Sequence, residues 1–494
     1  MTKRQPKIAI VGAGMSGLCA AIALQRGGIH DVTIYEKANE VGGTWRENKY
    51  PGLTCDVPSR FYQFTFATNP GWSRLFSPGP EIQAYFVDVA KRSGLSQRIR
   101  FGAQVVGAQF DGRRWVLKTG DGETSTVDFL ISATGVLHHP RTPDIAGLNE
   151  FAGPVFHSAR WDHSVNLQGR RVAVIGTGST GVQMISRLAG TPSKLSLFQR
   201  TAQWIMPLPN PRYLQLTKIS HRAVPLLDHL AYQVHRIAFE IFAGALVKPG
   251  WRRQFIGALC KANLRTVRDP RLRQALTPDY APMCKRLVMS GSFYRAIQRD
   301  DVELVTAGID RIESRGIATK DGVLREMDVI VLATGFDAHA YMRPMELVGR
   351  DGLTIDEAWQ DGPRAFQTVA IPGFPNFFML LGPHSPVGNF PLTAVAETQA
   401  DHIVRWIRRW QHGEFDTVEP TATAAGAYNS ALSAAMPGTV WTTGCDSWYL
   451  DKNGLPGVWP DTPAKHRTML ARPHSEDYLL RAAAPLGGSS RGVQ

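Results

Sequence analysis

Two glycine-rich segments of the sequence have the spacing of loops that bind dinucleotides. Each has the pattern Gly-x-Gly-x-x-Gly, and the six glycines are Gly12, Gly14, Gly17, Gly176, Gly178 and Gly181. Glu36 follows the first glycine of the first loop by 24 residues, and Arg200 follows the first glycine of the second loop by the same 24. An acid at this position hydrogen-bonds a free ribose diol, whereas an Arg receives a 2′-phosphate. The pair predicts one unphosphorylated dinucleotide and one NADP(H) in a single chain, and therefore redox chemistry.

Each loop needs a buried strand before it and a helix after it, and the sequence supplies both. Short apolar runs predict parallel strands, at 8–11 and 32–35 around the first loop and at 171–175 and 195–198 around the second. Helical patterns follow both glycine loops directly. Glycine lets the backbone approach a pyrophosphate at a helix N-terminus, where amide groups and the helix dipole favour an anion. FAD and NADPH are the natural pair of cofactors, which predicts a flavin oxidoreductase.

Two further segments repeat one another. Residues 128–135 and 328–335 each contain an acid, a buried strand and an Ala-Thr-Gly turn. They resemble the paired turns of flavoproteins with two dinucleotide domains, where the chain passes from one domain towards the other. The sequence therefore predicts an α/β fold with two doubly wound, Rossmann-like domains.

Composition and length limit the possible classes of protein. A chain of 494 residues with 43% hydrophobic residues is expected to form two or three globular domains. The sequence contains no stretch of 18 apolar residues, so we expect no membrane-spanning helix. The first apolar run is expected to be a strand rather than a signal peptide. The five cysteines form no close pair, which argues for a reducing, cytoplasmic location and against a disulfide framework. The missing C-x-x-C pair also excludes a flavin disulfide reductase.

The net charge of +13 is concentrated in one segment. Residues 211–286 carry 14 Lys and Arg against 4 Asp and Glu, with helical periodicity and many apolar positions. This segment is expected to be a helical insertion with a solvated basic face. Weak attachment to an anionic membrane surface is the alternative. No nucleic-acid module is present, and we expect neither a nucleic-acid partner nor an obligate protein partner.

Two longer motifs identify a family. Residues 151–162 match F-x-G-x-x-x-H-x-x-x-W-[PD], and residues 42–56 match G-G-x-W-x-x-x-x-[FY]-P-G-x-x-x-D. The chain thereby resembles the type I Baeyer–Villiger monooxygenases over nearly its whole length. The fixed positions of the first motif are Phe151, Gly153, His157, Trp161 and Asp162. Trp161 and Asp162 favour this branch over the nitrogen- and sulfur-oxygenating flavin monooxygenases, which usually have Tyr where Trp161 stands.

The resemblance implies roles for particular residues. Arg286 is expected to be the catalytic cation beside the flavin, and Asp56 the carboxylate that positions it. His157 is expected to couple domain movement rather than to catalyse. The remaining cofactor contacts implied, besides Asp56 and the loop residues, are Thr44 and Trp45 for FAD and Arg200, Thr201, Lys285 and Trp448 for NADP. No histidine has metal-ligand spacing, so no metal is expected.

The resemblance also implies a reaction. NADPH and O₂ would convert a small lipophilic ketone to an ester or lactone through a C4a-peroxyflavin and a tetrahedral adduct, whose oxyanion a fixed Arg stabilises. Three alternatives stay open: a nitrogen- or sulfur-oxygenating monooxygenase, an NADPH oxidase that releases hydrogen peroxide, and a non-catalytic flavoprotein.

The expected domain limits follow from the order of these motifs. The FAD-binding domain is predicted at 1–145 and 370–494, and the NADP-binding domain at 146–210 and 287–369. The helical insertion at 211–286 interrupts the NADP-binding domain. Residues 380–390 are expected to help shape the ketone pocket, and the tail at 483–494 is expected to be disordered.

Overall fold

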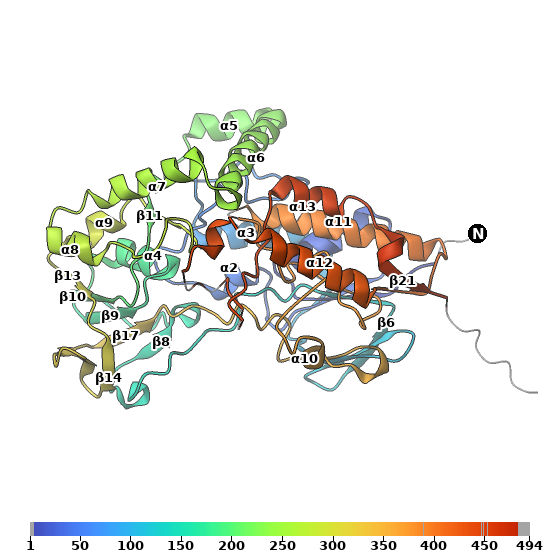
Figure 1. Ribbon diagram of the computed structural model, residues 1–494, viewed down its shortest axis with the longest axis horizontal. Coiled ribbons are helices and arrows are strands. Elements are labelled where there is room, and N and C mark those ends of the chain that lie inside the picture. Colours follow the sequence, from blue (N-terminus) through green and yellow to red (C-terminus); the bar gives the residue numbers. More distant parts are fainter. Residues whose placement is uncertain (1–3, 389, 446, 448, 452, 483–494) are drawn as a thin grey trace, which may run out of the picture.

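Two five-stranded parallel sheets form the frame of the molecule (Figure 1). The computed structural model describes residues 4–388, 390–445, 447, 449–451 and 453–482. Trp448 and the tail at 483–494 therefore lie outside the described residues. The first sheet has the order β19 (Phe377–Met379), β7 (Phe129–Ser132), β1 (Ile8–Val11), β2 (Val32–Tyr35) and β3 (Ile99–Arg100). The second has the order β13 (Val302–Val305), β10 (Lys194–Phe198), β9 (Arg171–Ile175), β17 (Val329–Leu332) and β8 (Val155–His157).

The elements predicted around the glycine loops are confirmed. Helix α1 (Met15–Arg26) follows β1, and α4 (Ser179–Leu188) follows β9. Strands β1, β7 and β17 are buried along their whole length, as their unbroken apolar sequences require in a sheet covered on both faces. The predicted α/β class with two doubly wound units is therefore observed.

Each unit also carries a small antiparallel sheet. In the first it contains β4 (Val105–Phe110), β5 (Trp115–Thr119) and β6 (Thr124–Val127), and in the second β14 (Ile309–Glu313), β15 (Gly316–Thr319) and β16 (Leu324–Glu326). Strand β18 (Glu346–Val348) adds to the first of these sheets by pairing with β4. Since β18 lies in the segment expected to belong to the NADP-binding domain, we propose that the chain returns to the FAD-binding domain before β18 rather than at 370.

The basic segment forms helices, as expected. They are α5 (Gln215–Ala223), α6 (Pro225–Val247), α7 (Trp251–Leu264) and α8 (Pro270–Ala275), bracketed by the paired short strands β11 (Ile205–Met206) and β12 (Val288–Met289). Helices α5 and α6 stand out at the top of the molecule in Figure 1. A buried ion pair between Arg60 and Asp228 fixes α6 to the FAD-binding part. Within the described residues, no helix is long and apolar enough to cross a bilayer.

The remaining elements cover the sheets. Helix α11 (Leu392–Gln411) packs against α1, and its buried face includes Ile403, Trp406 and Ile407. The others are α2 (Thr44–Glu47), α3 (Gly79–Arg92), α9 (Phe293–Ala296), α10 (Ile355–Ala358), α12 (Ala422–Ala435), α13 (Pro463–Leu470), β20 (Thr417–Pro420) and β21 (Tyr478–Arg481). One large apolar core surrounds the first sheet and a second fills the space between α4, α7 and the second sheet.

Candidate active site

The first glycine loop has a backbone that only glycine tolerates. Gly12 has φ +107°, and a Cβ there would lie 2.6 Å from the Ala133 carbonyl oxygen. A Cβ on Gly17 would lie 1.9 Å from the Gly12 oxygen. The Ala-Thr-Gly segment after β7 therefore serves as the floor of the loop. The result is a tight glycine turn at the N-terminus of α1, whose backbone suits a pyrophosphate.

The second loop repeats this construction against the second Ala-Thr-Gly segment. A Cβ on Gly176 would lie 2.4 Å from the Ala333 oxygen, and one on Gly181 would lie 2.1 Å from the Gly176 oxygen. Gly178 faces open space, with no atom within 4 Å of the position of a Cβ. Gly176 and Gly181 are thus needed for close contacts within the protein, whereas Gly178 leaves space in which a phosphate can approach the backbone. The duplicated turns noticed in the sequence are explained by this contact.

Glu36 and Arg200 lie at the ends of the second strands, as predicted. Glu36 is buried, and its carboxylate accepts hydrogen bonds from the N–H groups of Ala13 (2.7 Å) and Ala38 (2.9 Å). A carboxylate has about four lone-pair sites, so it retains capacity for a ribose diol. Arg200 is exposed and makes no hydrogen bond or ion pair with any described residue. Its guanidinium is therefore available to a 2′-phosphate.

The segment from Thr44 to Asp56 connects the two units. Helix α2 contains Thr44 and Trp45, and the Trp45 indole N–H donates to the Tyr62 hydroxyl at 3.1 Å. Gly52, with φ +89°, packs against α4 so closely that a Cβ would lie 2.6 Å from the Gln183 oxygen. Gly52 of this motif is therefore needed because the two units come into close contact at this position.

Gln183 on α4 completes that contact and was not identified from the sequence. Its side-chain oxygen accepts from the Tyr50 hydroxyl at 2.8 Å, and its amide donates to the Thr54 carbonyl at 3.0 Å. The helix that begins at the second loop is therefore hydrogen-bonded to the segment that ends at Asp56. The sequence offered one indication of this contact, namely a polar side chain within the predicted helix after the second loop.

Arg286 and Asp56 form a two-point ion pair, although 230 residues separate them. Arg286 Nε donates to Asp56 Oδ2 at 2.9 Å, and Nη2 donates to Oδ1 at 2.7 Å. Asp56 raises the pKa of Arg286 above its ordinary value, because the carboxylate favours the charged guanidinium. The Arg286 side chain keeps 33% of its exposure, and Asp56 engages two of its five N–H donors. The pair is thus a fixed, permanently charged donor held by a carboxylate.

Two neighbouring groups stay neutral beside this pair. Burial raises the pKa of the Cys55 thiol, and the Asp56 charge raises it further. Burial also raises the pKa of Tyr449, whereas Arg286 acts in the opposite direction. Cys55 is therefore a thiol and no nucleophile at neutral pH. Tyr449, which the sequence analysis did not single out, is a protonated hydroxyl close to the guanidinium.

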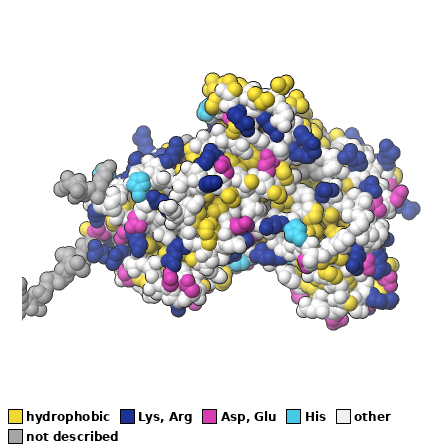
Figure 2. Space-filling model, turned by 180° about the vertical axis from the view of Figure 1, so that it is seen from behind, with side chains coloured by type: hydrophobic (Ala, Val, Ile, Leu, Met, Phe, Trp, Pro, Cys, Tyr) yellow, Lys and Arg dark blue, Asp and Glu magenta, His cyan; other side chains and the backbone are white. Residues whose placement is uncertain are grey.

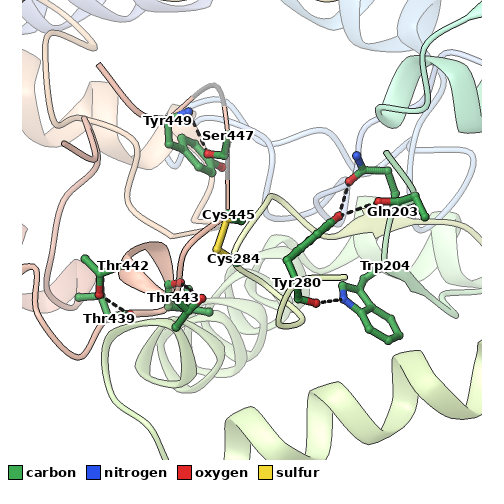
Figure 3. The surroundings of a disulfide bond; sticks show 12 residues. Gln203, Trp204, Tyr280, Cys284, Thr439, Thr442, Thr443, Cys445, Ser447 and Tyr449 are labelled. Carbon is green, nitrogen blue, oxygen red and sulfur yellow. Dashed lines mark hydrogen bonds between the residues drawn. A yellow bond between two sulfur atoms is a disulfide. The ribbon is translucent and has the colours of Figure 1, made fainter. Parts of the chain in front are cut away.

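Lys285 lies beside the chain that follows Arg200. Its ammonium lies 4.9 Å from the centre of the Tyr280 ring, and the Tyr280 hydroxyl donates to the Ala202 carbonyl at 3.1 Å. Figure 3 shows Tyr280 between its partners in the 202–204 segment and the turn that leads to Cys284. Thr201 is tied to the second glycine loop, because its carbonyl accepts from the Thr177 hydroxyl at 2.6 Å. The structure therefore brings three of the predicted NADP anchors to one region.

Cys284 and Cys445 form a disulfide, with Cα atoms 6.1 Å apart (Figure 3). The expectation that no cysteines pair was wrong for these two. Spacing along the chain could not reveal the pair, because 161 residues separate the cysteines and only the fold brings them together. Cys19, Cys55 and Cys260 are free and buried. The disulfide joins the turn before Lys285 and Arg286 to the C-terminal segment that contains Tyr449.

The segment 151–162 contains β8, the edge strand of the second sheet. His157 is buried at the end of β8, opposite Leu332 of β17, and its Nδ1 accepts from the Ala159 N–H at 3.1 Å. Burial lowers the pKa of His157, which favours the neutral ring. Its ring meets Phe336, just after the second Ala-Thr-Gly segment, edge to face at 5.7 Å. This position suits a role in the linker, as predicted, rather than in catalysis.

The other members of the motif are structural in their contacts. Phe151 is buried, and a Cβ on Gly153 would lie 2.5 Å from the Asp328 oxygen. Trp161 packs edge to face on Phe156 at 5.1 Å, and Asp162 caps a turn by accepting from the Ser164 N–H at 2.9 Å.

The expected substrate loop at 380–390 is held by one buried amide. Gln399 accepts from the Leu381 N–H at 2.8 Å and donates to the Ser385 hydroxyl at 2.8 Å. His384 in this loop has its pKa lowered to about 4 by burial, so its ring is neutral at neutral pH. A neutral, buried loop is compatible with an apolar ligand.

Comparisons with known proteins agree with this geometry. A family model described as an NAD(P)-binding Rossmann-like domain matches residues 10–78. A monooxygenase of Mycobacterium tuberculosis, named as uncharacterised, is 69% identical over 99% of both chains. A Baeyer–Villiger monooxygenase of Streptomyces coelicolor is 38% identical over 97% of this chain and 93% of its own. The solved structure of cyclohexanone monooxygenase from Rhodococcus sp. Phi1, bound to NADP⁺, has a TM-score of 0.86 and 28% identity, and covers 98% of this chain and 100% of that chain.

The fold and the two glycine loops define a flavin-dependent oxidoreductase with two dinucleotide-binding units. The chain belongs to the type I Baeyer–Villiger monooxygenases of the flavin monooxygenase family. The predicted class of enzyme, dependent on FAD and NADPH, is thereby confirmed. The residues of this structure fit both cofactors: each glycine loop turns into a helix N-terminus, one beside a buried carboxylate and the other beside a free guanidinium.

Proposed function

We propose that this flavoprotein monooxygenase uses NADPH and O₂ to convert a lipophilic ketone to an ester or lactone. The Asp56–Arg286 ion pair is the observation that carries the proposal. Insertion of oxygen beside a carbonyl develops negative charge, first on the attacking oxygen and then on the carbonyl oxygen. A fixed cation with several donors stabilises both.

The overall reaction balances with the two cofactors. Ketone, O₂, NADPH and a proton give ester, NADP⁺ and water, so that one oxygen atom enters the product and the other is reduced. When bound, FAD supplies the transfer of two electrons from NADPH to O₂. Asp56 keeps the guanidinium oriented at two points, which removes the freedom that a single hydrogen bond would leave.

Three further groups are assigned to NADP. Arg200 binds the 2′-phosphate, and Thr201 and Lys285 complete the anion site. Tyr280 supports this assignment, because it contacts both the Lys285 ammonium and Ala202, the residue that follows Thr201. Trp448, outside the described residues, is proposed to close over NADP. A cytoplasmic location is part of the proposal, since both cofactors are intracellular. The Cys284–Cys445 disulfide bears on this location, and its effect on stability can be measured separately.

A product balance tests the proposal. The purified FAD-loaded enzyme is given NADPH and air with linear, cyclic, aromatic and steroid ketones, while NADPH, ester and hydrogen peroxide are measured together. We expect at least one ketone to give close to one ester per NADPH. Hydrogen peroxide equal to NADPH with every ketone would contradict the proposal and indicate an oxidase. Turnover of thioethers or amines alone would indicate the related nitrogen- and sulfur-oxygenating class, and no NADPH turnover at all would indicate a non-catalytic flavoprotein.

A further inference from the structure

Helix α6 is apolar on both of its faces. Its inner face packs on the FAD-binding part through Tyr232 and Phe239, whose rings lie 5.1 Å and 5.4 Å from the Phe61 ring. Its outer face exposes large apolar side chains at intervals of four, four, three and four residues, namely Leu226, Leu230, Val234, Ile237 and Ile241. A soluble helix normally places polar residues on its outer face. The outer face of α6 therefore carries an apolar stripe where polar side chains are expected.

The stripe continues onto the neighbouring helices. Leu214, Leu216, Ile219 and Val224 are exposed on and beside α5, and Trp251 and Phe255 are exposed on the first turns of α7. Eleven of the sixteen exposed large apolar side chains among the described residues fall between Leu214 and Phe255. Figure 2 shows hydrophobic side chains gathered over the top of the molecule, where Figure 1 places α5 and α6. We call these eleven residues the apical patch, and a patch so concentrated marks an interaction surface.

The charges around the apical patch have one sign. Residues 211–268 contain ten Lys and Arg, and their only acids are Asp228 and Glu240. Both acids point inward: Asp228 pairs with Arg60, and Glu240 pairs with Arg467 at 2.6 Å. Lys248 and Arg252 are exposed beside Trp251, and Arg222 is exposed at the end of α5. Within residues 211–268, the exposed charges beside the apical patch are thus all cations.

These observations decide between the possible occupants. A second copy of the chain would bring two equally basic surfaces together, which opposes association. An anionic bilayer surface offers both an apolar layer for the stripe and negative headgroups for its border. Trp251, with its ring exposed near Arg252, has the side-chain type that prefers the membrane interface.

We propose that the apical patch docks this enzyme on an anionic lipid bilayer. The inner ion pairs hold α6 rigidly, so the docked face keeps a fixed orientation relative to the active site. The inner end of α6 reaches the expected substrate loop, since a Cβ on Gly388 would lie 2.5 Å from Leu246 Cδ1. If the proposed function holds, docking would present that loop to ketones dissolved in the bilayer.

Vesicle flotation tests the docking without reference to turnover. The FAD-loaded enzyme is mixed with vesicles of phosphatidylglycerol and phosphatidylcholine in equal parts, and separately with phosphatidylcholine alone. We expect the enzyme to bind the anionic vesicles. Its binding should be roughly tenfold weaker to neutral vesicles, and also to anionic vesicles at high salt. No flotation of the wild-type enzyme with anionic vesicles would overturn the proposal.

A pair of triple variants locates the surface. Leu230→Glu, Val234→Glu and Ile237→Glu together should reduce flotation at least about tenfold, because each places a charge in the apolar layer. The matched control carries Val87→Glu, Phe101→Glu and Val323→Glu, three apolar side chains of similar exposure elsewhere. It should float like the wild-type enzyme, and both variants should keep their FAD content. Equal flotation of the two variants would refute the apical patch as the docking surface.

Sedimentation equilibrium without lipid distinguishes the other occupant. A monomer at all concentrations is expected. Two results together would assign the apical patch to a second copy of the chain: a dimer that dissociates in the triple α6 variant, and no binding to vesicles. They would overturn the proposal of docking on a bilayer. Failure of ketone oxidation alone would affect only the proposed function, because flotation is measured independently.

Discussion

Glu36 and Arg200 occupy equivalent positions in two similar strand–helix units, yet the structure holds them differently. Glu36 is buried, and two backbone N–H groups fix its carboxylate against the first loop. Arg200 is exposed and has no hydrogen-bond or ion-pair partner among the described residues. A buried, fixed acceptor suits a cofactor that stays bound, whereas an exposed cation suits one that enters and leaves. The same backbone thus presents a buried, fixed acceptor in one unit and an exposed, unpartnered cation in the other.

The connections between the units matter as much as their difference. The disulfide, the Gln183 contact and the Asp56–Arg286 pair each join one unit to the other. All three meet near the segment that contains Lys285 and Arg286. If the proposed function holds, we expect oxygenation to depend on how the two units are held together.

Removal of the disulfide should have the largest effect on stability. In Cys445→Ser the unfolded chain gains the freedom of a long loop, and the free energy of unfolding should fall by about 4 kcal/mol. Urea unfolding with and without a reductant measures this. The reductant should lower the stability of the wild-type enzyme and leave Cys445→Ser unchanged. Equal stability of both proteins under oxidising conditions would contradict a structural role for this bond.

Acid should weaken the FAD-binding part through His402. The Trp406 indole N–H donates to His402 Nε2 at 3.1 Å, so the ring must be neutral, with Nδ1 donating to the Leu470 carbonyl at 3.0 Å. Burial lowers the pKa of His402 to about 4. Because the unfolded histidine binds its proton near pH 6.5, stability is complete above that pH. It falls as the pH approaches 4, by about 3 kcal/mol.

Unfolding measured between pH 7 and pH 4 by urea tests this. In His402→Gln this part of the pH dependence should disappear, although the variant will be less stable at pH 7. An unchanged slope in that variant would show that the loss of stability arises elsewhere.

Substitution of Arg200 should change the choice of nucleotide. Arg200→Gln loses a charged hydrogen bond to the 2′-phosphate, and the KM for NADPH should rise roughly thirtyfold while that for NADH stays constant. Lys194→Gln, at the start of the same strand and paired with Glu303, is the matched control and should change neither. A parallel rise for NADH would mean that Arg200 does not read the phosphate.

Loss of the Gln183 contact should have a smaller effect. Gln183→Ala removes three hydrogen bonds between the units and should lower stability by about 1–2 kcal/mol. Its more specific result should be a lower yield of ester per NADPH. Ser186→Ala, on the same helix but without a contact to residues 50–56, should leave the yield unchanged.

The sequence predicted those parts of the molecule that depend on local patterns. The strands around both loops and the helices of the basic segment follow from apolar periodicity and glycine spacing, and Glu36 and Arg200 follow from their positions after the loops. The Asp56–Arg286 pair required a resemblance to a family, because no spacing rule connects residues so far apart. The disulfide and Gln183 were missed for a physical reason: their partners become neighbours only after the two units have docked. The pairing of β18 with β4 was missed because the two strands lie within one unit but more than 200 residues apart in the sequence.

Removal of Arg286 separates oxygen insertion into a ketone from the simple oxidation of NADPH. Ester and hydrogen peroxide are measured per NADPH for the wild-type enzyme, Arg286→Ala and Arg286→Lys with the ketone found best in the panel. We expect that Arg286→Ala still oxidises NADPH but makes hydrogen peroxide instead of ester, with a loss of ester formation of at least about a hundredfold. Arg286→Lys should retain little, since an ammonium cannot keep the two-point contact with Asp56. Ester formation by Arg286→Ala at the wild-type rate would contradict the role assigned to the ion pair.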